Sequence, residues 1–230
     1  PPPPPFLLMI RRPPRATQRV SSAASDVYKR QKLIIIISLV NFISLGFINL
    51  GWSADLRKGL SAFRSGNFVT AFGEWKPLAD KGDPTAQNSL GIMYYYGFGI
   101  PKNYRTAAKW FARAAKQGHD SAQHFLATLY DRGRGVPKRP DFALKLYLLS
   151  ANQGYAKAQS MLGHIYHQGE IVPGNYQTAV KWWERAALRG NAPAQNSLGL
   201  MYMEGKGVTK NAETAVKWFR FCLLYTSDAA

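Results

Sequence analysis

The feature that most constrains this chain is a repeat with a period of 36 residues. Residues 83–118, 119–154, 155–190 and 191–221 align without gaps, and the fourth copy is incomplete. Every copy has the same residue at positions 4, 5, 8 and 12, which are alanine, glutamine, leucine and tyrosine. A fixed period of roughly 20 to 50 residues is typical of stacked supersecondary units. The sequence therefore predicts a repeat array rather than a domain with one central core.

Each copy of the repeat predicts two helices. Positions 4, 8 and 12 are spaced i, i+4, i+8, which places them on one face of a first helix, over residues 84–96 in the first copy. Gly97 and Pro101 end this helix, because glycine adopts positive φ and proline forces the residue before it out of helical geometry. Alanines and aromatic residues at helical spacing then predict a second helix, and Gly118 fits a left-handed cap at its end. The predicted fold class is all-α, with helical hairpins whose apolar faces are covered by the next hairpin.

A shorter hairpin precedes the four copies. Residues 55–82 contain two apolar helical patterns separated by a turn at Gly66 and Asn67. The prediction is an α-solenoid of about five hairpins. In the fourth copy the pattern breaks off at Cys222, so we expect the native array to continue further and its C-terminal cap to be missing here.

The two ends of the chain do not fit the repeat. Residues 1–31 open with five prolines and show no helical or strand period. This segment and residues 222–230 resemble translated sequencing-adaptor read-through, so we expect both to be non-native and exclude them from the fold. The formal net charge of the whole chain is +17, and the remaining residues stay clearly basic. Excluding the tail also removes the single cysteine, Cys222, and with it any predicted disulfide or thiolate chemistry.

Residues 32–54 predict export from the cytoplasm. An uncharged apolar run, Leu33 to Leu50, follows Lys32, and small residues follow the run. This arrangement is typical of a secretory signal peptide. We expect cleavage after Ser53 or Ala54, which gives a periplasmic or secreted protein. The alternative is an uncleaved N-terminal anchor, in which case the membrane contact is through this segment alone.

The repeat also carries a recognisable pattern. Residues 83–221 follow A-x-A-Q-x-x-L-G-x-x-Y-x-x-G-x-G-V-P and then A-x-x-W-F-x-x-A-A-x-x-G. This pattern resembles Sel1-like repeats, which are relatives of the tetratricopeptide repeat. The resemblance implies a right-handed α-solenoid that serves as a scaffold for protein–protein contacts, with secreted bacterial members acting in the envelope. Copy three departs from the pattern at Glu170 and Ile171, and copy two has Leu146 in place of tryptophan. The β-lactam chemistry linked to cysteine-rich members is not implied, because this chain lacks those cysteines.

A second stripe on the first helices is the predicted binding site. Positions 6, 10 and 13 are spaced i, i+4, i+7, away from the packing stripe, and stacked first helices are expected to line the concave surface. Position 14 would form the edge of this groove. The alternative is a solvated face with no partner. The predicted residues are Asn88, Ile92, Tyr95, Tyr96, His124, Thr128, Asp131, Arg132, Ser160, His164, His167, Gln168, Asn196, Leu200, Met203 and, at the edge, Glu204.

Signals for catalysis or metal binding are weak. His164 and His167 are spaced i, i+3, with Glu170 just beyond the end of their helix, which could present two imidazoles to a metal ion. No metalloprotease-like or comparable motif accompanies them, so we interpret them as ordinary groove residues. The recurring glycine pairs follow helices rather than strands and indicate turns, not phosphate loops. We therefore predict no catalytic residue, no metal and no cofactor.

The positive charge favours anionic partners. Arg132, Arg134, Lys138 and Arg139 cluster around one loop between helices, and a basic field speeds the encounter with acidic molecules. Nucleic acid fits the charge but conflicts with export. The predicted function is a non-catalytic scaffold of the bacterial envelope, or a secreted one, that binds a protein or peptide partner. The alternative is a module for anionic envelope polysaccharide, with stacking by Tyr95 and Tyr96, and a hydrolase is less favoured.

Overall fold

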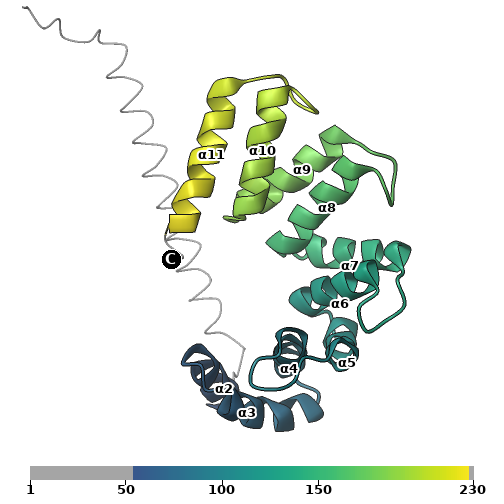
Figure 1. The fold of residues 1–230 in the computed structure, drawn as a ribbon, viewed down its shortest axis with the longest axis vertical. Helices are drawn as coiled ribbons and strands as arrows, with labels where there is room; N and C mark the ends of the chain where they lie inside the picture. The colour runs from purple at the N-terminus through teal and green to yellow at the C-terminus, as the bar shows by residue number, and fades with distance from the viewer. Residues whose placement is uncertain (1–53, 228–230) are drawn as a thin grey trace, which may run out of the picture. The chain divides into compact units, whose positions relative to one another are not determined.

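The repeat folds into consecutive helical hairpins. The computed structural model describes residues 54–227, and the segments 1–31 and 32–53, with the predicted signal peptide, lie outside the described residues. The described residues form ten helices and no strand, which confirms the all-α class (Figure 1). The helices are α2 (Ala54–Arg64), α3 (Phe68–Asp80), α4 (Pro84–Tyr96), α5 (Tyr104–Lys116), α6 (Asp120–Arg132), α7 (Pro140–Asn152), α8 (Ala156–Gln168), α9 (Tyr176–Ala187), α10 (Ala192–Glu204) and α11 (Ala212–Ser227).

The loop within each hairpin is fixed by the same two features in every copy. The first helix ends at a glycine in the left-handed region, as at Gly97, where φ is 82° and the N–H donates to the Met93 carbonyl. The backbone N–H of position 21 then donates to the carbonyl of the repeated tyrosine at position 12, as from Asn103 to Tyr94 over 2.8 Å. Both features satisfy carbonyls that the helix end leaves unpaired. The spacing of the tyrosine, the glycine and position 21, which recurs in every copy, therefore sets the geometry of the hairpin.

Side-chain caps begin most of the helices. The Asn103 and Asn175 side chains accept from the backbone N–H groups of Thr106 and Thr178, over 2.9 and 2.8 Å. Asp83 caps α4 in the same way, by accepting from Ala86 over 2.8 Å. These polar residues satisfy orphan N–H groups of the first turn.

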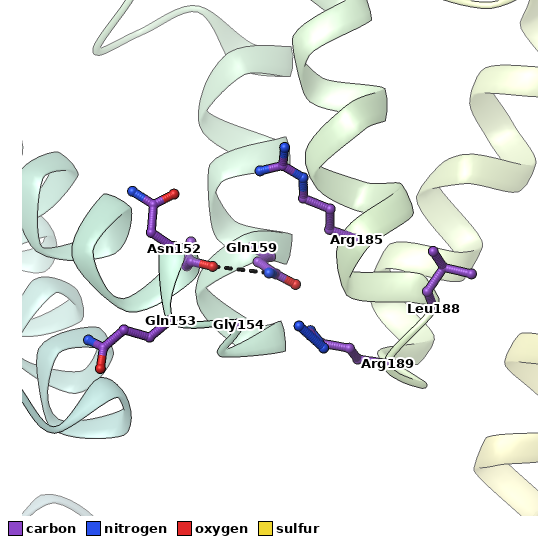
Figure 2. Close-up of a pocket in the computed structure, with 8 residues that line it drawn as sticks. Asn152, Gln153, Gly154, Gln159, Arg185, Leu188 and Arg189 are labelled. Carbon is purple, nitrogen blue, oxygen red and sulfur yellow. Dashed lines mark hydrogen bonds between the residues drawn. The ribbon is translucent and has the colours of Figure 1, made fainter. Parts of the chain in front are cut away.

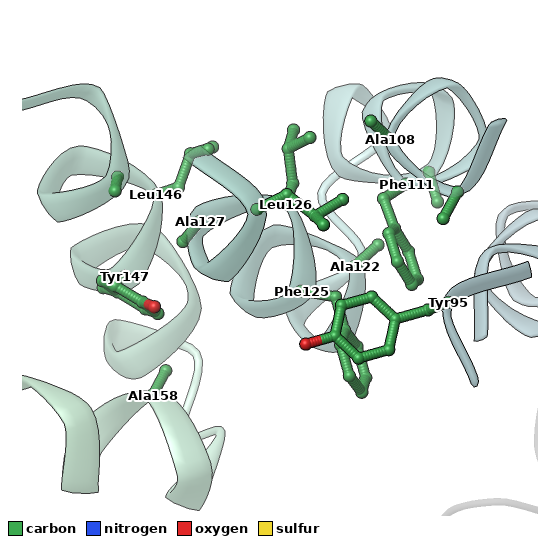
Figure 3. Close-up of a cluster of buried hydrophobic side chains, with 14 of the residues drawn as sticks. Tyr95, Ala108, Phe111, Ala122, Phe125, Leu126, Ala127, Leu146, Tyr147 and Ala158 are labelled. Carbon is green, nitrogen blue, oxygen red and sulfur yellow. The ribbon is translucent and has the colours of Figure 1, made fainter. Parts of the chain in front are cut away.

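The hydrophobic core runs along the array instead of lying at one centre. Its largest buried cluster joins side chains of α4 to α8, and smaller clusters cover the hairpins before and after it. Figure 3 shows Tyr95 of α4 beside Phe125 of α6, with ring centroids 5.4 Å apart. Each hairpin thus completes the core of its neighbour, as expected for a solenoid.

Within residues 54–227 the hairpins follow one another around an arc (Figure 1). Each helix packs against the next along the chain, and the first helices of neighbouring hairpins also touch, α4 with α6 and α8 with α10. These direct contacts place the first helices on the shorter, inner side of the arc. The side of each first helix that does not pack against adjacent helices is therefore the candidate binding surface.

Candidate functional site

Part of the predicted groove stripe is buried between hairpins. Its buried residues are Asn88, Tyr95, His124, Thr128 and Ser160. For these five residues the prediction of an open groove is wrong. Position 6, and position 13 of the first copy, turn toward the following hairpin, whereas Thr128, at position 10, accepts a hydrogen bond from the Tyr147 hydroxyl of its own hairpin. In the last described hairpin, Asn196 occupies position 6 and is exposed.

His124 shows why these positions are buried. Its ring lies 5.6 Å from that of Tyr147 in α7 and 5.3 Å from that of Tyr155, which directly precedes α8. The side chain is 8% exposed, and its Nδ1 has no hydrogen-bond partner among the described residues. Burial, together with a smaller effect of the Lys157 charge, lowers the pKa of His124 from 6.5 to about 4. His124 is therefore a buried packing residue between aromatic rings.

The remaining predicted residues lie at the surface or partly exposed. Exposed members are Tyr96, Arg132, Gln168, Asn196, Leu200, Met203 and Glu204, and half-buried members are Ile92, Asp131, His164 and His167. The exposed and half-buried set is dominated by positions 10 and 14. These two positions lie on one side of the first helix, at i and i+4.

Two further positions belong to the same face and were missed in the sequence analysis. Position 3 is exposed at Lys157, and position 7 is half-buried at Ser89 and Met161. Positions 3, 7, 10 and 14 are spaced i, i+4, i+7, i+11, which is a continuous helical stripe. We call the exposed and half-buried residues at these four positions the open face. Phe125, Thr128 and Ser197 occupy such positions but are buried, so they do not belong to it. The signal that could have found it is the difference between copies, since all four positions vary.

The two histidines considered as metal ligands pack against aromatic rings. His164 and His167 lie 5.2 and 5.5 Å from the ring of Trp183, and His167 also lies 5.4 Å from Tyr176. Burial lowers the pKa of His164, and the charge of His167 adds to that effect. Within residues 54–227, no group of three or more His, Cys, Asp or Glu side chains could hold a metal ion. In the same residues, no helix is both long and apolar enough to cross a bilayer.

The repeat units match a known family along most of the array. The family model of the Sel1 repeat matches residues 84–119, 120–155, 156–191 and 192–221, which together make up more than half of the chain. The chain belongs to the Sel1 repeat family. Sel1 repeat proteins are in general scaffolds that contact other proteins.

Solved structures of Sel1 repeat proteins share this fold. A Sel1 repeat protein from Oxalobacter formigenes is 31% identical over 75% of this chain and 68% of its own, with a TM-score of 0.68. The protein c5321, a protective antigen of uropathogenic Escherichia coli with an SLR fold, is also 31% identical, with a TM-score of 0.66. That match covers 74% of this chain and 38% of c5321. A Sel1 repeat protein from Klebsiella pneumoniae, at 22% identity and a TM-score of 0.54, shows the fold alone. No curated protein matches the chain.

The third Sel1 repeat opens a cleft against the second. Position 17 is glycine in the other copies, and a Cβ on Gly135 would lie 2.5 Å from the backbone of Tyr104 in the preceding hairpin. Ile171 occupies this position in the third copy, and a cleft of about 770 Å³ lies beside it. Its lining includes Asp131 and Glu170 as well as lysines, so its charge is mixed. The departure from the Sel1 pattern thus coincides with a cleft, at a position where a side chain would not fit the close approach seen at Gly135.

Proposed function

We propose that this Sel1 repeat protein is a non-catalytic scaffold that binds a segment of a protein partner along its open face. The observation that carries the proposal is the contrast between a repeated framework and a variable open face. Positions 4, 5, 8 and 12 are the same in all copies, whereas the open face differs in each. Position 14 reads Tyr96, Arg132, Gln168 and Glu204, and all four are exposed. A fixed backbone with varied exposed side chains is suited to recognition of one particular sequence.

The charge of this surface supports an acidic partner segment. Arg132 and Lys157 lie on the open face of the central two repeats and are both exposed. Neither forms an ion pair with a carboxylate among the described residues. Unpaired cations at an exposed surface attract acidic segments and increase the association rate.

We further propose that the protein acts in the bacterial envelope or outside the cell. The apolar segment Leu33 to Leu50 after Lys32 supports export. N-terminal sequencing of the envelope-localised protein tests this, with Ala54 or Asp55 as the expected first residue. A chain that still begins before Leu33 would indicate a membrane tether instead.

An anionic envelope polysaccharide is the second candidate ligand. The side chain of Tyr96 is 48% exposed, beside the ring of Tyr95 at a centroid distance of 4.8 Å. An exposed tyrosine near cationic residues can stack on a sugar ring while the cations pair with its acid groups. Tyr95 itself is buried, so Tyr96 alone would provide the stacking surface.

The test is site-specific photocrosslinking in envelope extract. A photoreactive phenylalanine analogue replaces Tyr96 on the open face in one variant and Lys109, an exposed residue of the second helix, in the matched control. We expect one discrete protein adduct from position 96 that is lost when Arg132 and Lys157 are also changed to alanine. Equal adducts from both positions would overturn the assignment of the open face. A crosslinked glycan in place of a protein would favour the second candidate.

A further inference from the structure

Repeats two and three form a second cleft. It lies beside the turn at Gly154, away from the cleft at Ile171. It has a volume of about 440 Å³ and is lined by the end of α7, the start of α8 and the end of α9 (Figure 2). Arg185 and Arg189 contribute two guanidinium groups, and Gln159 contributes a side chain that is 3% exposed. The cleft is separate from the open face, because it is formed by the turns between hairpins.

In the first two repeats a pair of glutamines occupies this place. The glutamine at position 5 always donates its Nε2 to a carbonyl of the preceding second helix, as Gln159 does to Ala151 over 3.0 Å. In the first two repeats its Oε1 accepts from a second glutamine at position 35. Gln117 donates to Gln87 over 2.9 Å, and Gln153 donates to Gln123 over 2.8 Å.

The third repeat breaks this pairing. Position 35 is Arg189, and the Gln159 Oε1 has no hydrogen-bond partner among the described residues. The guanidinium of Arg189 lies instead against Gly154, where a Cβ would come within 2.8 Å of its Nη2. The Gln195 Oε1 is also unpaired, but its position 35 is residue 225, whose side chain lies outside the described side chains. Gln159 is thus a buried acceptor whose usual donor has been replaced.

The two arginines give the cleft a charge that complements an anion. The guanidinium of Arg185 stacks over the ring of Trp182 at 4.6 Å, which holds it in place beside the cleft. Neither arginine forms an ion pair within the described part of the chain. Figure 2 shows Arg185, Arg189 and the Gln159 amide arranged around the same space. Guanidinium groups bind carboxylates through paired N–H···O bonds.

We propose that this cleft binds a peptide carboxylate together with an amide N–H close to it. The carboxylate would lie between Arg185 and Arg189, and the amide would donate to the Gln159 Oε1. An amide donor is favoured because the same acceptor takes an amide N–H, from a glutamine side chain, in repeats one and two. A peptide C-terminus and an Asp or Glu residue within a peptide both carry these two groups. The site goes beyond the proposed function, since it involves neither the open face nor its residues.

The experiment is calorimetric titration of the whole chain with small peptide analogues. N-acetyl-alanine represents a C-terminus, N-acetyl-aspartate α-amide represents an internal acidic residue, and acetate provides the charge without the amide. We expect one of the two amide compounds to bind roughly tenfold or more tightly than acetate, because the amide fills a buried acceptor. Equal affinity for acetate would overturn the role of Gln159. Tighter binding of a uronic acid than of either amide compound would overturn the peptide assignment.

Three variants locate the binding. Arg189→Gln restores the glutamine of the other repeats, so it should abolish binding while raising the melting temperature, which also shows that the variant is folded. Arg185→Gln should weaken binding roughly tenfold. The matched control is Arg113→Gln, which removes the equivalent arginine of repeat one, stacked over Trp110 at 4.7 Å, and should leave binding unchanged. No binding by the unmodified chain, or the same affinity in all four proteins, would overturn the proposal.

Discussion

Gly163 lies directly against the indole of Trp183, so closely that a Cβ at Gly163 would be 2.4 Å from the indole Cδ1 and Nε1 atoms. The same contact recurs between Gly91 and Phe111, at 2.5 Å. In repeat two, the equivalent positions 9 and 29 are Ala127 and Tyr147, both fully buried. Position 9 is therefore glycine where the ring at position 29 is phenylalanine or tryptophan and alanine where it is tyrosine, and this match affects how closely the two helices of a hairpin approach.

Substituting Gly163 by alanine should destabilise the protein by about 1–3 kcal/mol, because the added methyl group displaces a buried indole. The matched control is Gly73→Ala on the exposed side of α3, where a Cβ meets nothing within 4 Å. That substitution should be neutral or stabilising by up to about 1 kcal/mol. Chemical denaturation of both variants measures the difference.

A double variant shows whether the contact itself is responsible. Gly163→Ala combined with Trp183→Tyr reproduces the pair found in repeat two. Residues in contact are coupled, so the combined loss should be smaller than the sum of the single losses by about 1 kcal/mol. Strict additivity would contradict the match between positions 9 and 29.

Introducing asparagine at Arg139 should stabilise the protein. Arg139 precedes α7 without a side-chain cap, whereas the equivalent Asn103 and Asn175 cap their helices. Its backbone, at φ −145° and ψ 81°, is already close to that of Asn103, at φ −148° and ψ 98°. A new cap contributes about 1 kcal/mol, and the lost stacking of Arg139 on Phe142 offsets about half of this.

Thermal unfolding provides the measurement for the cap. The reverse substitution, Asn175→Arg, removes an existing cap and should destabilise the protein by about 1 kcal/mol. If Arg139→Asn lowered the melting temperature, the equivalence of the four loops would be refuted.

The burial of His124 should make stability depend on pH. The pKa of His124 is about 4 in the folded protein, against 6.5 for an unperturbed histidine, because burial disfavours the charged ring. Between these two values the unfolded chain binds more protons than the folded one. The stabilising contribution is therefore complete above pH 6.5 and is lost as the pH falls toward 4, by about 3 kcal/mol.

The variant His124→Phe separates this contribution from others of the same sign. The pKa values of His119 and His164 are also lowered by burial, so they add to the decrease in stability at acid pH. Phenylalanine keeps a ring beside Tyr147 and Tyr155 but does not titrate. Urea unfolding at pH 7 and pH 4.5 should show a smaller decrease in the variant, and an identical decrease would mean that His124 is accessible to water.

The helices and their order could be predicted from the sequence, because a repeated period of 36 residues shows each local pattern several times. The binding stripe could be predicted only in part, because several of its residues are buried. Asn88, His124 and Ser160 are polar, so nothing in their chemistry distinguishes a buried contact between hairpins from a solvated surface. Their burial follows from the next hairpin, which covers position 6. The cleft beside Gln159 was not found either, because its partner position lies 30 residues further along the chain and is recognised as a partner only once the hairpins are stacked.

The pairing of positions 5 and 35 gives a last prediction. Substitution of position 35 by alanine should have different effects on stability in repeats two and three. Gln153→Ala removes the donor to the buried Gln123 Oε1 and should destabilise the protein by about 1–2 kcal/mol. Arg189→Ala, at the same position of the next repeat, breaks no hydrogen bond to Gln159, whose Oε1 is already unpaired, and should change stability by less than about 0.5 kcal/mol. Both side chains are exposed and both changes end in alanine, so the difference reports the hydrogen bonds of Gln153, which donates to the Gln123 Oε1 over 2.8 Å and to the Leu149 carbonyl over 3.3 Å. Equal losses in urea unfolding would mean that Arg189 donates to Gln159 in solution, and the cleft would then be closed.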